Sequence, residues 1–263
     1  MKLGGFGHIA DYEKIRAAGF DFAELDVPEI EALPEEEFQI LCGKVRESGF
    51  PVLTGARALP IADPWFFTDQ FSMEEYKEYL ENACRRAGMI GMKCIIIGNG
   101  KARMLLDETS AGKESRFIDF MRMFAGIAAK NHLEVILEPL GPKYSNYINT
   151  LPEAVRVIRE IGMPNVFTMA DLRHVVWAKE SFEDIVTYVD HIHHIHVDYP
   201  LSWPERPFPT AEDDYDYTDF LSAIKRSGYQ GTLTIEADIP KDWNTAYSKA
   251  AVVLKEICSD TTF

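Results

Sequence analysis

Short apolar segments alternate with longer amphipathic segments along almost the whole chain. Apolar runs of a few residues, rich in β-branched side chains and bounded by polar or turn-forming residues, are typical of buried strands. We predict eight such strands, at residues 3–6, 20–25, 51–54, 93–97, 133–137, 166–170, 192–197 and 232–235. Because the runs are short and largely apolar, both faces of every strand are expected to be covered.

The segments between these runs have the periodicity and the end signals of helices. Pro34 precedes three glutamates, which favour a helix N-terminus, and Gly49 is a typical residue at a helix end. Comparable patterns predict helices at residues 11–18, 34–48, 72–87, 115–130, 151–161, 182–189, 217–227 and 243–257.

Eight strands in strict alternation with eight helices predict an α/β fold, a closed (β/α)8 TIM barrel, with residues 1–263 as a single domain. Buried parallel strands covered by helices require this type of arrangement, and the length suits it. The alternative is an open doubly wound sheet. That fold would need a glycine-rich phosphate turn after an early strand, and Gly4-Gly5-Phe6-Gly7 lacks the GxGxxG spacing.

The charge and the apolar content limit the partners of the protein. A formal net charge of −15 disfavours nucleic acid or an anionic membrane as a partner. The sequence contains neither an apolar run long enough to span a membrane nor an apolar leader. The four cysteines include no CxxC pair, so we expect reduced thiols and a cytoplasmic protein.

Residues 191–198, His-Ile-His-His-Ile-His-Val-Asp, contain four of the seven histidines. Side chains alternate between the two faces of a strand, so His194, His196 and Asp198 should share one face and His193 the other. Adjacent histidines therefore cannot all bind one ion. We predict that His196, at the end of the strand, is a ligand, and that His194 points inward one layer deeper.

Each of the last four predicted strands ends in a side chain that can bind a metal: Glu138, Asp171, His196 and Glu236. In a TIM barrel the carboxyl ends of the strands form the functional face. One such residue alone is explained by a solvated strand end. Four in register would concentrate negative charge that a cation must compensate. Three carboxylates and one imidazole suit Mn²⁺ or Mg²⁺.

Further polar residues lie close to these strand ends. His174 follows Asp171 by three residues and would orient substrate or Asp171, or else lie on the surface. Arg206 would bind a hydroxyl, carboxylate or phosphate, or else lie in a solvated loop. Glu24, Arg57 and Asn99 end earlier strands and are candidates for the wall of a pocket.

These motifs resemble those of the sugar phosphate isomerase/epimerase superfamily of xylose isomerase-like TIM barrels. The superfamily includes ketose 3-epimerases, hydroxypyruvate isomerases, inosose dehydratases and the endonuclease IV group. The similar segments are Glu138-Pro-Leu, Asp171-Leu-Arg-His174, His194-Ile-His196-Val-Asp198, Arg206 and Thr234-Ile-Glu236.

The resemblance implies a role for each matched residue. Glu138, Asp171, His196 and Glu236 would bind one divalent metal ion. Glu138 and Glu236 would also be the catalytic acid/base pair. His174 and Arg206 would contact the substrate. Members of the family often form dimers or tetramers, which leaves a homo-oligomer open.

The expected function is that of a metal-dependent sugar or keto-sugar isomerase or epimerase, which moves a proton next to a carbonyl through an enediolate. Mn²⁺ or Mg²⁺ is expected, and Zn²⁺ or Co²⁺ would also fit. Lysine and arginine are sparse near the predicted rim, which favours an unphosphorylated sugar.

Three alternative functions remain from the sequence. The first is a lyase or dehydratase acting on a keto-sugar or inosose. The second is an endonuclease IV-like phosphodiesterase, which is disfavoured because Arg57 and Asn99 stand where that group has additional histidines. The third is a non-catalytic sugar-binding barrel.

Overall fold

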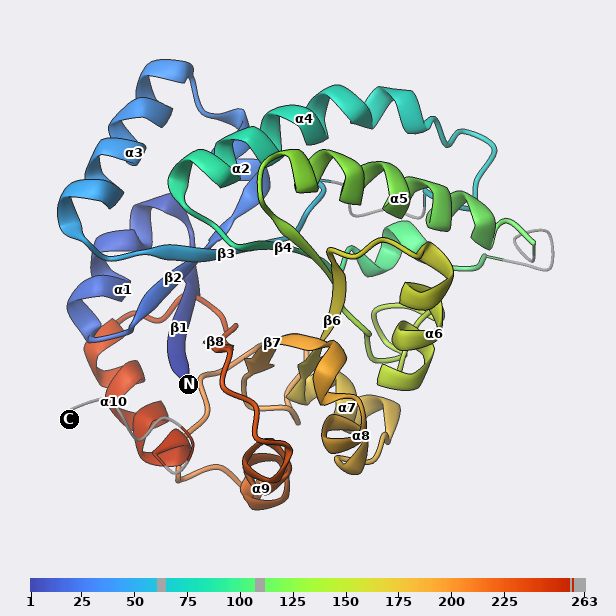
Figure 1. Cartoon of the computed structure of the whole chain (residues 1–263). Coiled ribbons are helices and arrows are strands. Elements are labelled where there is room, and N and C mark those ends of the chain that lie inside the picture. Colours follow the sequence, from blue (N-terminus) through green and yellow to red (C-terminus); the bar gives the residue numbers. More distant parts are fainter. Residues whose placement is uncertain (61–64, 107–111, 256, 258–263) are drawn as a thin grey trace.

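The eight predicted strands form a closed parallel barrel in which each strand pairs with its neighbours in sequence and the first strand pairs with the last. This computed structural model describes residues 1–60, 65–106, 112–255 and 257. The predicted (β/α)8 TIM barrel is confirmed, with strands in the centre and helices outside (Figure 1). The strands are β1 (Lys2–Gly7), β2 (Phe22–Asp26), β3 (Val52–Ala56), β4 (Cys94–Ile97), β5 (Glu134–Leu137), β6 (Val166–Asp171), β7 (Ile192–Val197) and β8 (Thr232–Ile235).

Among the described residues, eight α-helices correspond to the predicted ones and two more were not predicted. The predicted set is α1 (Tyr12–Ala18), α3 (Glu35–Ser48), α4 (Met73–Ile90), α5 (Glu114–Lys130), α6 (Leu151–Ile161), α8 (Glu183–Thr187), α9 (Thr218–Ser227) and α10 (Trp243–Leu254). The additional helices are α2 (Val27–Ala32) and α7 (Leu172–Ala178). Both are short and begin directly after a strand, so they are too brief to show a clear helical period.

Alternate side chains of the strands face either the surrounding helices or the interior of the barrel. Ile95 and Ile97 pack in the large core shared with the helices. On the same strand, Cys94 and Ile96 form a small inner cluster with Ile136 and Met169. The interior near β2 and β7 is polar instead, because Glu24, His194 and His196 are buried there.

The histidine-rich strand β7 follows the predicted alternation at His194 and His196 but not at His193. His194 and His196 are buried inside the barrel. His193 is half-buried at a shift in register between β6 and β7. Its Nδ1 lies 2.8 Å from Glu134 Oε2 and its ring stacks on Phe167, so it lies at the amino-terminal end of the barrel interior and not against the helices. The strand therefore places His194 and His196 one above the other within the barrel.

Three of the four cysteines lie among the described residues. Cys42, Cys84 and Cys94 are free thiols. Cys258 lies outside the described residues. Among the helices in the described parts of the chain, none is both long and apolar enough to cross a bilayer.

Candidate metal and substrate site

The four predicted strand-end side chains lie together at the carboxyl-terminal rim of the barrel. Glu138 and Glu236 directly follow β5 and β8, Asp171 ends β6, and His196 is near the end of β7. One potential ligand atom from each of these residues lies within 4.8 Å of the others. His196 Nδ1 is 3.2 Å from Glu236 Oε2, 3.8 Å from Glu138 Oε1 and 3.8 Å from Asp171 Oδ2. We call these four residues the rim cluster.

The donor atoms of the rim cluster suit a divalent cation. Asp171 and His196 are almost fully buried, and Glu138 is 7% exposed. Among the described residues, Glu138 Oε1 and His196 Nδ1 have no hydrogen-bond partner. Buried polar atoms without partners are costly, and a cation shared by three carboxylates and an imidazole would satisfy them. The residues present therefore fit the metal that the sequence predicts.

Arg206 lies inside the site rather than in a solvated loop. Its NH1 is 2.7 Å from Glu236 Oε2, and its NH2 donates to Asp171 Oδ2 at 3.1 Å. Its Nε donates to Asp198 Oδ2 at 2.7 Å, an oxygen that also accepts from Arg173 Nε at 2.7 Å. Asp198, on the inward face of the seventh strand's extension, thus fixes the position of Arg206 against the cluster.

The two glutamates of the cluster differ in their electrostatic surroundings. Burial, reinforced by the nearby Glu236 carboxylate, raises the pKa of Glu138 to about 8. Burial also acts to raise the pKa of Glu236, but the Arg206 guanidinium and His196 outweigh it and hold that pKa below its ordinary value. The two carboxyl groups are chemically identical, but their surroundings raise the pKa of Glu138 and lower that of Glu236.

His174 is buried beside the cluster, so it is not a surface histidine. It belongs to the unpredicted helix α7, whose N-cap is Asp171; Asp171 Oδ1 accepts from the His174 backbone N–H at 3.2 Å. The His174 ring Nε2 lies 3.6 Å from Glu138 Oε1 and 3.9 Å from Asp171 Oδ2. The Asp-x-x-His spacing was a sequence signal for this cap, because aspartate at N-cap commonly accepts from the third helical residue.

A cavity of about 450 Å³ adjoins the rim cluster and is lined by Glu138, His196, Glu236, His174 and Arg206. This volume is in the range of sites for small molecules. Loops after several strands complete the wall with Arg57, Asn99, Lys101, Met104, Tyr144 and Trp203. Sequence analysis did not identify Tyr144, Lys101 or Met104, because loop residues of these types have no distinguishing spacing.

Arg57 and Asn99, which were predicted to line a pocket, do so with an unusual backbone. Their φ angles are 55° and 38°, in the left-handed region that disfavours residues other than glycine. Asn99 also connects two loops, because its side chain accepts from Leu59 N and donates to Leu59 O. Such strain is common where surrounding contacts fix a functional loop.

The pocket contains more cations than the sequence analysis expected at the rim. Its lining includes Arg57, Lys101, Lys143 and Arg206. Arg57 is paired with Asp26, and Lys143 lies over the Trp177 ring at 4.3 Å from its centre. The expectation of sparse positive charge is therefore wrong, because loops distant in sequence bring these side chains to one wall.

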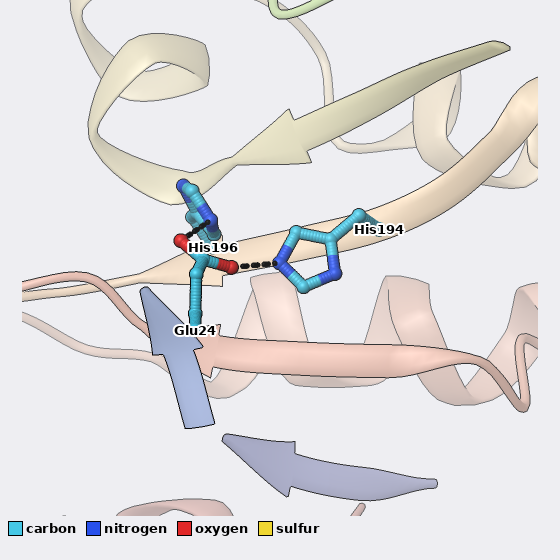
Figure 2. Close-up of side chains that lie close together, drawn as sticks. All are labelled: Glu24, His194 and His196. Carbon is cyan, nitrogen blue, oxygen red and sulfur yellow. Dashed lines mark ion pairs between the residues drawn. The ribbon is translucent and has the colours of Figure 1, made fainter. Parts of the chain in front are cut away.

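Glu24 does not line the cavity, contrary to the prediction. β2 continues through Leu25 to Asp26, so Glu24 lies one layer below the rim and is fully buried. Its Oε2 is 3.0 Å from His194 Nε2 and its Oε1 is 3.0 Å from His196 Nε2 (Figure 2). Although burial acts to raise it, the pKa of Glu24 is held well below its ordinary value by His196 and His194.

Comparison with known proteins defines the family. Residues 12–257 match the model of the xylose isomerase-like TIM barrel, and the chain belongs to this family.

Two curated relatives are similar over different shares of the chain. A 3-dehydro-D-guloside 4-epimerase from Escherichia coli (strain K12) is 23% identical over 238 residues, which cover 87% of this chain and 86% of the relative. A putative hydroxypyruvate isomerase from Mus musculus is 23% identical over 167 residues, 61% of this chain. That match spans 59% of the mouse protein, less than two thirds of its length.

Solved structures share the fold at low sequence identity. A D-psicose 3-epimerase determined in the presence of D-fructose has a TM-score of 0.80 and 16% identity, covering 98% of this chain and 99% of that one. The IOLI protein with a bound zinc atom has a TM-score of 0.78 and 17% identity, covering 100% of this chain and 99% of that one.

Proposed function

We propose that this chain, as a single barrel domain, is a divalent-metal-dependent sugar or keto-sugar isomerase or epimerase that moves a proton on the carbon next to a carbonyl. The observation that supports this most directly is the convergence of Glu138, Asp171, His196 and Glu236 beside a cavity of about 450 Å³. Membership of the xylose isomerase-like family and the names of the relatives point to the same chemistry.

The rim cluster would hold the metal ion. Mn²⁺ or Mg²⁺ suits a set dominated by carboxylates, and Zn²⁺ is compatible with it, as the zinc atom bound to the structurally similar IOLI protein suggests. When bound, the ion would polarise the substrate carbonyl as a Lewis acid.

The proton transfer is assigned to Glu138 and Glu236. They enter the site from β5 and β8, two strands that are not neighbours in the barrel. A substrate between them would meet one carboxylate on each face. One glutamate would remove the proton from the carbon next to the carbonyl, and the other would return a proton on the opposite face, which inverts that carbon. Return on the same face, to the neighbouring carbon, would give isomerisation instead.

Two further side chains would orient the substrate. His174 and Arg206 both line the cavity and both contact members of the rim cluster. The guanidinium of Arg206 can donate to sugar oxygens, and the His174 ring can bind a hydroxyl at the wall. Their contacts with the cluster would align the substrate carbonyl with the two glutamates.

An elimination is the second candidate, because proton removal next to a carbonyl also begins a dehydration. The feature that favours it is the long loop after β7, which contributes Trp203 and Arg206 to the cavity wall. Elimination requires a leaving group on the neighbouring carbon, and this group would have to fit against that wall of the cavity.

Proton NMR in D₂O tests the proposed function. The Mn²⁺- or Mg²⁺-loaded protein is mixed with ketoses, 3-keto-glycosides and hydroxypyruvate. Phosphorylated ketoses are included because four cationic side chains line the cavity. We expect deuterium at the carbon next to the carbonyl, with the carbon skeleton and oxidation level unchanged. An unsaturated or dehydrated product would establish the lyase instead, and no exchange with any compound would refute both.

Gly98 provides a test of where Glu138 must lie. A methyl group at Gly98, directly after β4, would overlap Oε2 of Glu138. We expect Gly98→Ala to displace that carboxylate and to lower kcat by about 10²-fold, the order of effect that a displacement of about 1 Å produces. Gly43→Ala in α3 is the matched control, since a methyl group there meets nothing within 4 Å. Wild-type kcat in the Gly98 variant would contradict the role of Glu138.

A further inference from the structure

A buried carboxylate below the rim joins the two inward histidines of β7. Glu24 contacts His194 through one oxygen and His196 through the other, each at 3.0 Å (Figure 2). Glu24 is not among the residues that line the cavity. His196 thus belongs to two groups at once: its Nε2 faces Glu24, and its Nδ1 faces the rim cluster.

Hydroxyl groups hold the Glu24 carboxylate in place. Thr54 Oγ1 donates to Glu24 Oε2 at 2.6 Å, and Thr234 Oγ1 donates to the same oxygen at 3.0 Å. Donors from β3 and β8 therefore restrain a side chain that enters from β2. Glu24 Oε2 already contacts two hydroxyl groups and His194. We therefore interpret Glu24, His194 and His196 as a group that supports the rim cluster and not as a second metal site.

The position of Glu24 determines which nitrogen of His196 carries the proton. An ionised carboxylate only accepts hydrogen bonds. A lone pair on His196 Nε2 would face Glu24 Oε1 at 3.0 Å and be repelled, whereas a proton on Nε2 makes the contact attractive, even though the ring N–H is not aligned for a regular hydrogen bond. In the neutral ring the remaining lone pair is then on Nδ1, which faces Glu138, Asp171 and Glu236.

We infer that Glu24 is a positioning residue for the metal site: it keeps the proton of His196 on Nε2 and presents Nδ1 as a ligand to the rim cluster. This inference rests on the proposed function, because it requires that the rim cluster binds a divalent cation. Residues that support a metal-binding histidine in this way typically contribute 10–100-fold to metal affinity.

Calorimetric titration of the metal-free protein with Mn²⁺ tests the inference. Glu24→Gln keeps the shape of the side chain and removes its charge. We expect it to bind one ion still, with a dissociation constant about 10–100-fold higher than that of the wild type. The matched control is Glu134→Gln, which removes the carboxylate beside His193 at the amino-terminal end of the barrel, opposite the rim; its Mn²⁺ affinity should be unchanged.

A second variant preserves the test if Glu24→Gln does not fold. Thr54→Val removes one hydroxyl donor to Glu24 without changing any charge. We expect it to weaken Mn²⁺ binding in the same direction, but less than the loss of the carboxylate does. Unchanged affinity in a folded Glu24→Gln protein, or in a folded Thr54→Val protein where Glu24→Gln does not fold, would overturn the inference.

The same titrations separate this inference from the proposed function. Asp171→Asn removes a member of the rim cluster that does not contact Glu24, and it should weaken binding sharply. Weak binding by Asp171→Asn with wild-type binding by Glu24→Gln would refute the role of Glu24 and leave the proposed function intact. A wild-type protein that binds no Mn²⁺ would refute both. Loss of binding in Glu24→Gln with wild-type affinity in Asp171→Asn would place the ion at Glu24 itself and overturn the inference.

Discussion

Glu138→Gln and Glu236→Gln are each expected to lower kcat by at least about 10²-fold, the lower end of what general acid–base groups contribute. An amide has nearly the shape of a carboxyl group, but it neither removes nor returns a proton at the pH of the assay. Both side chains lie at the rim, beyond the ends of β5 and β8, so the barrel should remain folded. Steady-state rates with the best substrate of the NMR panel, at saturating Mn²⁺, measure the effect.

Glu134→Gln is the matched control for this prediction. Glu134 starts the same strand that Glu138 follows, and it pairs with His193 away from the site. Its replacement should leave kcat unchanged. Metal content must be measured in all three variants, so that loss of the ion is distinguished from loss of proton transfer. A rate close to that of the wild type in either rim variant would contradict the acid/base assignment of that glutamate.

Removal of the metal should abolish turnover and reduce the stability of the folded chain. An ion that binds only the folded state stabilises it by about 2.7 kcal/mol when its concentration is 100 times its dissociation constant. Such an ion would also relieve the repulsion among Glu138, Asp171 and Glu236, whose ligand atoms lie within 4.8 Å of one another. Chelation should lower Tm, and added Mn²⁺ should restore both Tm and activity.

Two variants on one strand give this prediction a matched comparison. His196→Ala removes a member of the rim cluster, so Mn²⁺ should no longer raise its Tm appreciably. His193 lies near the start of β7, away from the rim cluster, so His193→Ala should retain the full increase. Equal Tm and equal activity before and after complete removal of metal would show that the site functions without an ion.

The fold was predictable because its signals are local. Most strands are short, largely apolar runs, and the long helix α3 has end signals at Pro34 and Gly49. Helices α2 and α7 escaped prediction for a physical reason. They continue directly from β2 and β6 without a loop, and their few residues are held by packing and, in α7, by the Asp171 cap rather than by a visible period.

Much of the candidate site was also visible in the sequence. Parallel strands in a barrel all end at one rim, so the residues at four strand ends were expected to lie together. The same rule placed Glu24 wrongly. Residues of β2 beyond it continue the ladder with β3, which leaves Glu24 one layer deeper. A strand's exact end depends on its neighbours, and those are not adjacent in sequence.

By itself, the sequence determined the alternation of elements, the inward face of His194 and His196, and the set of residues at the strand ends. These follow from the period of each segment and from the polarity of its last residue. Only the tertiary structure decided which polar and charged side chains contact each other. Closure of the barrel pairs β1 with β8 and places Thr234 against Glu24, 210 residues away in sequence. It also brings Arg206 back to Asp171 and Glu236. Such contacts depend on register and closure around the whole ring, which no local pattern specifies.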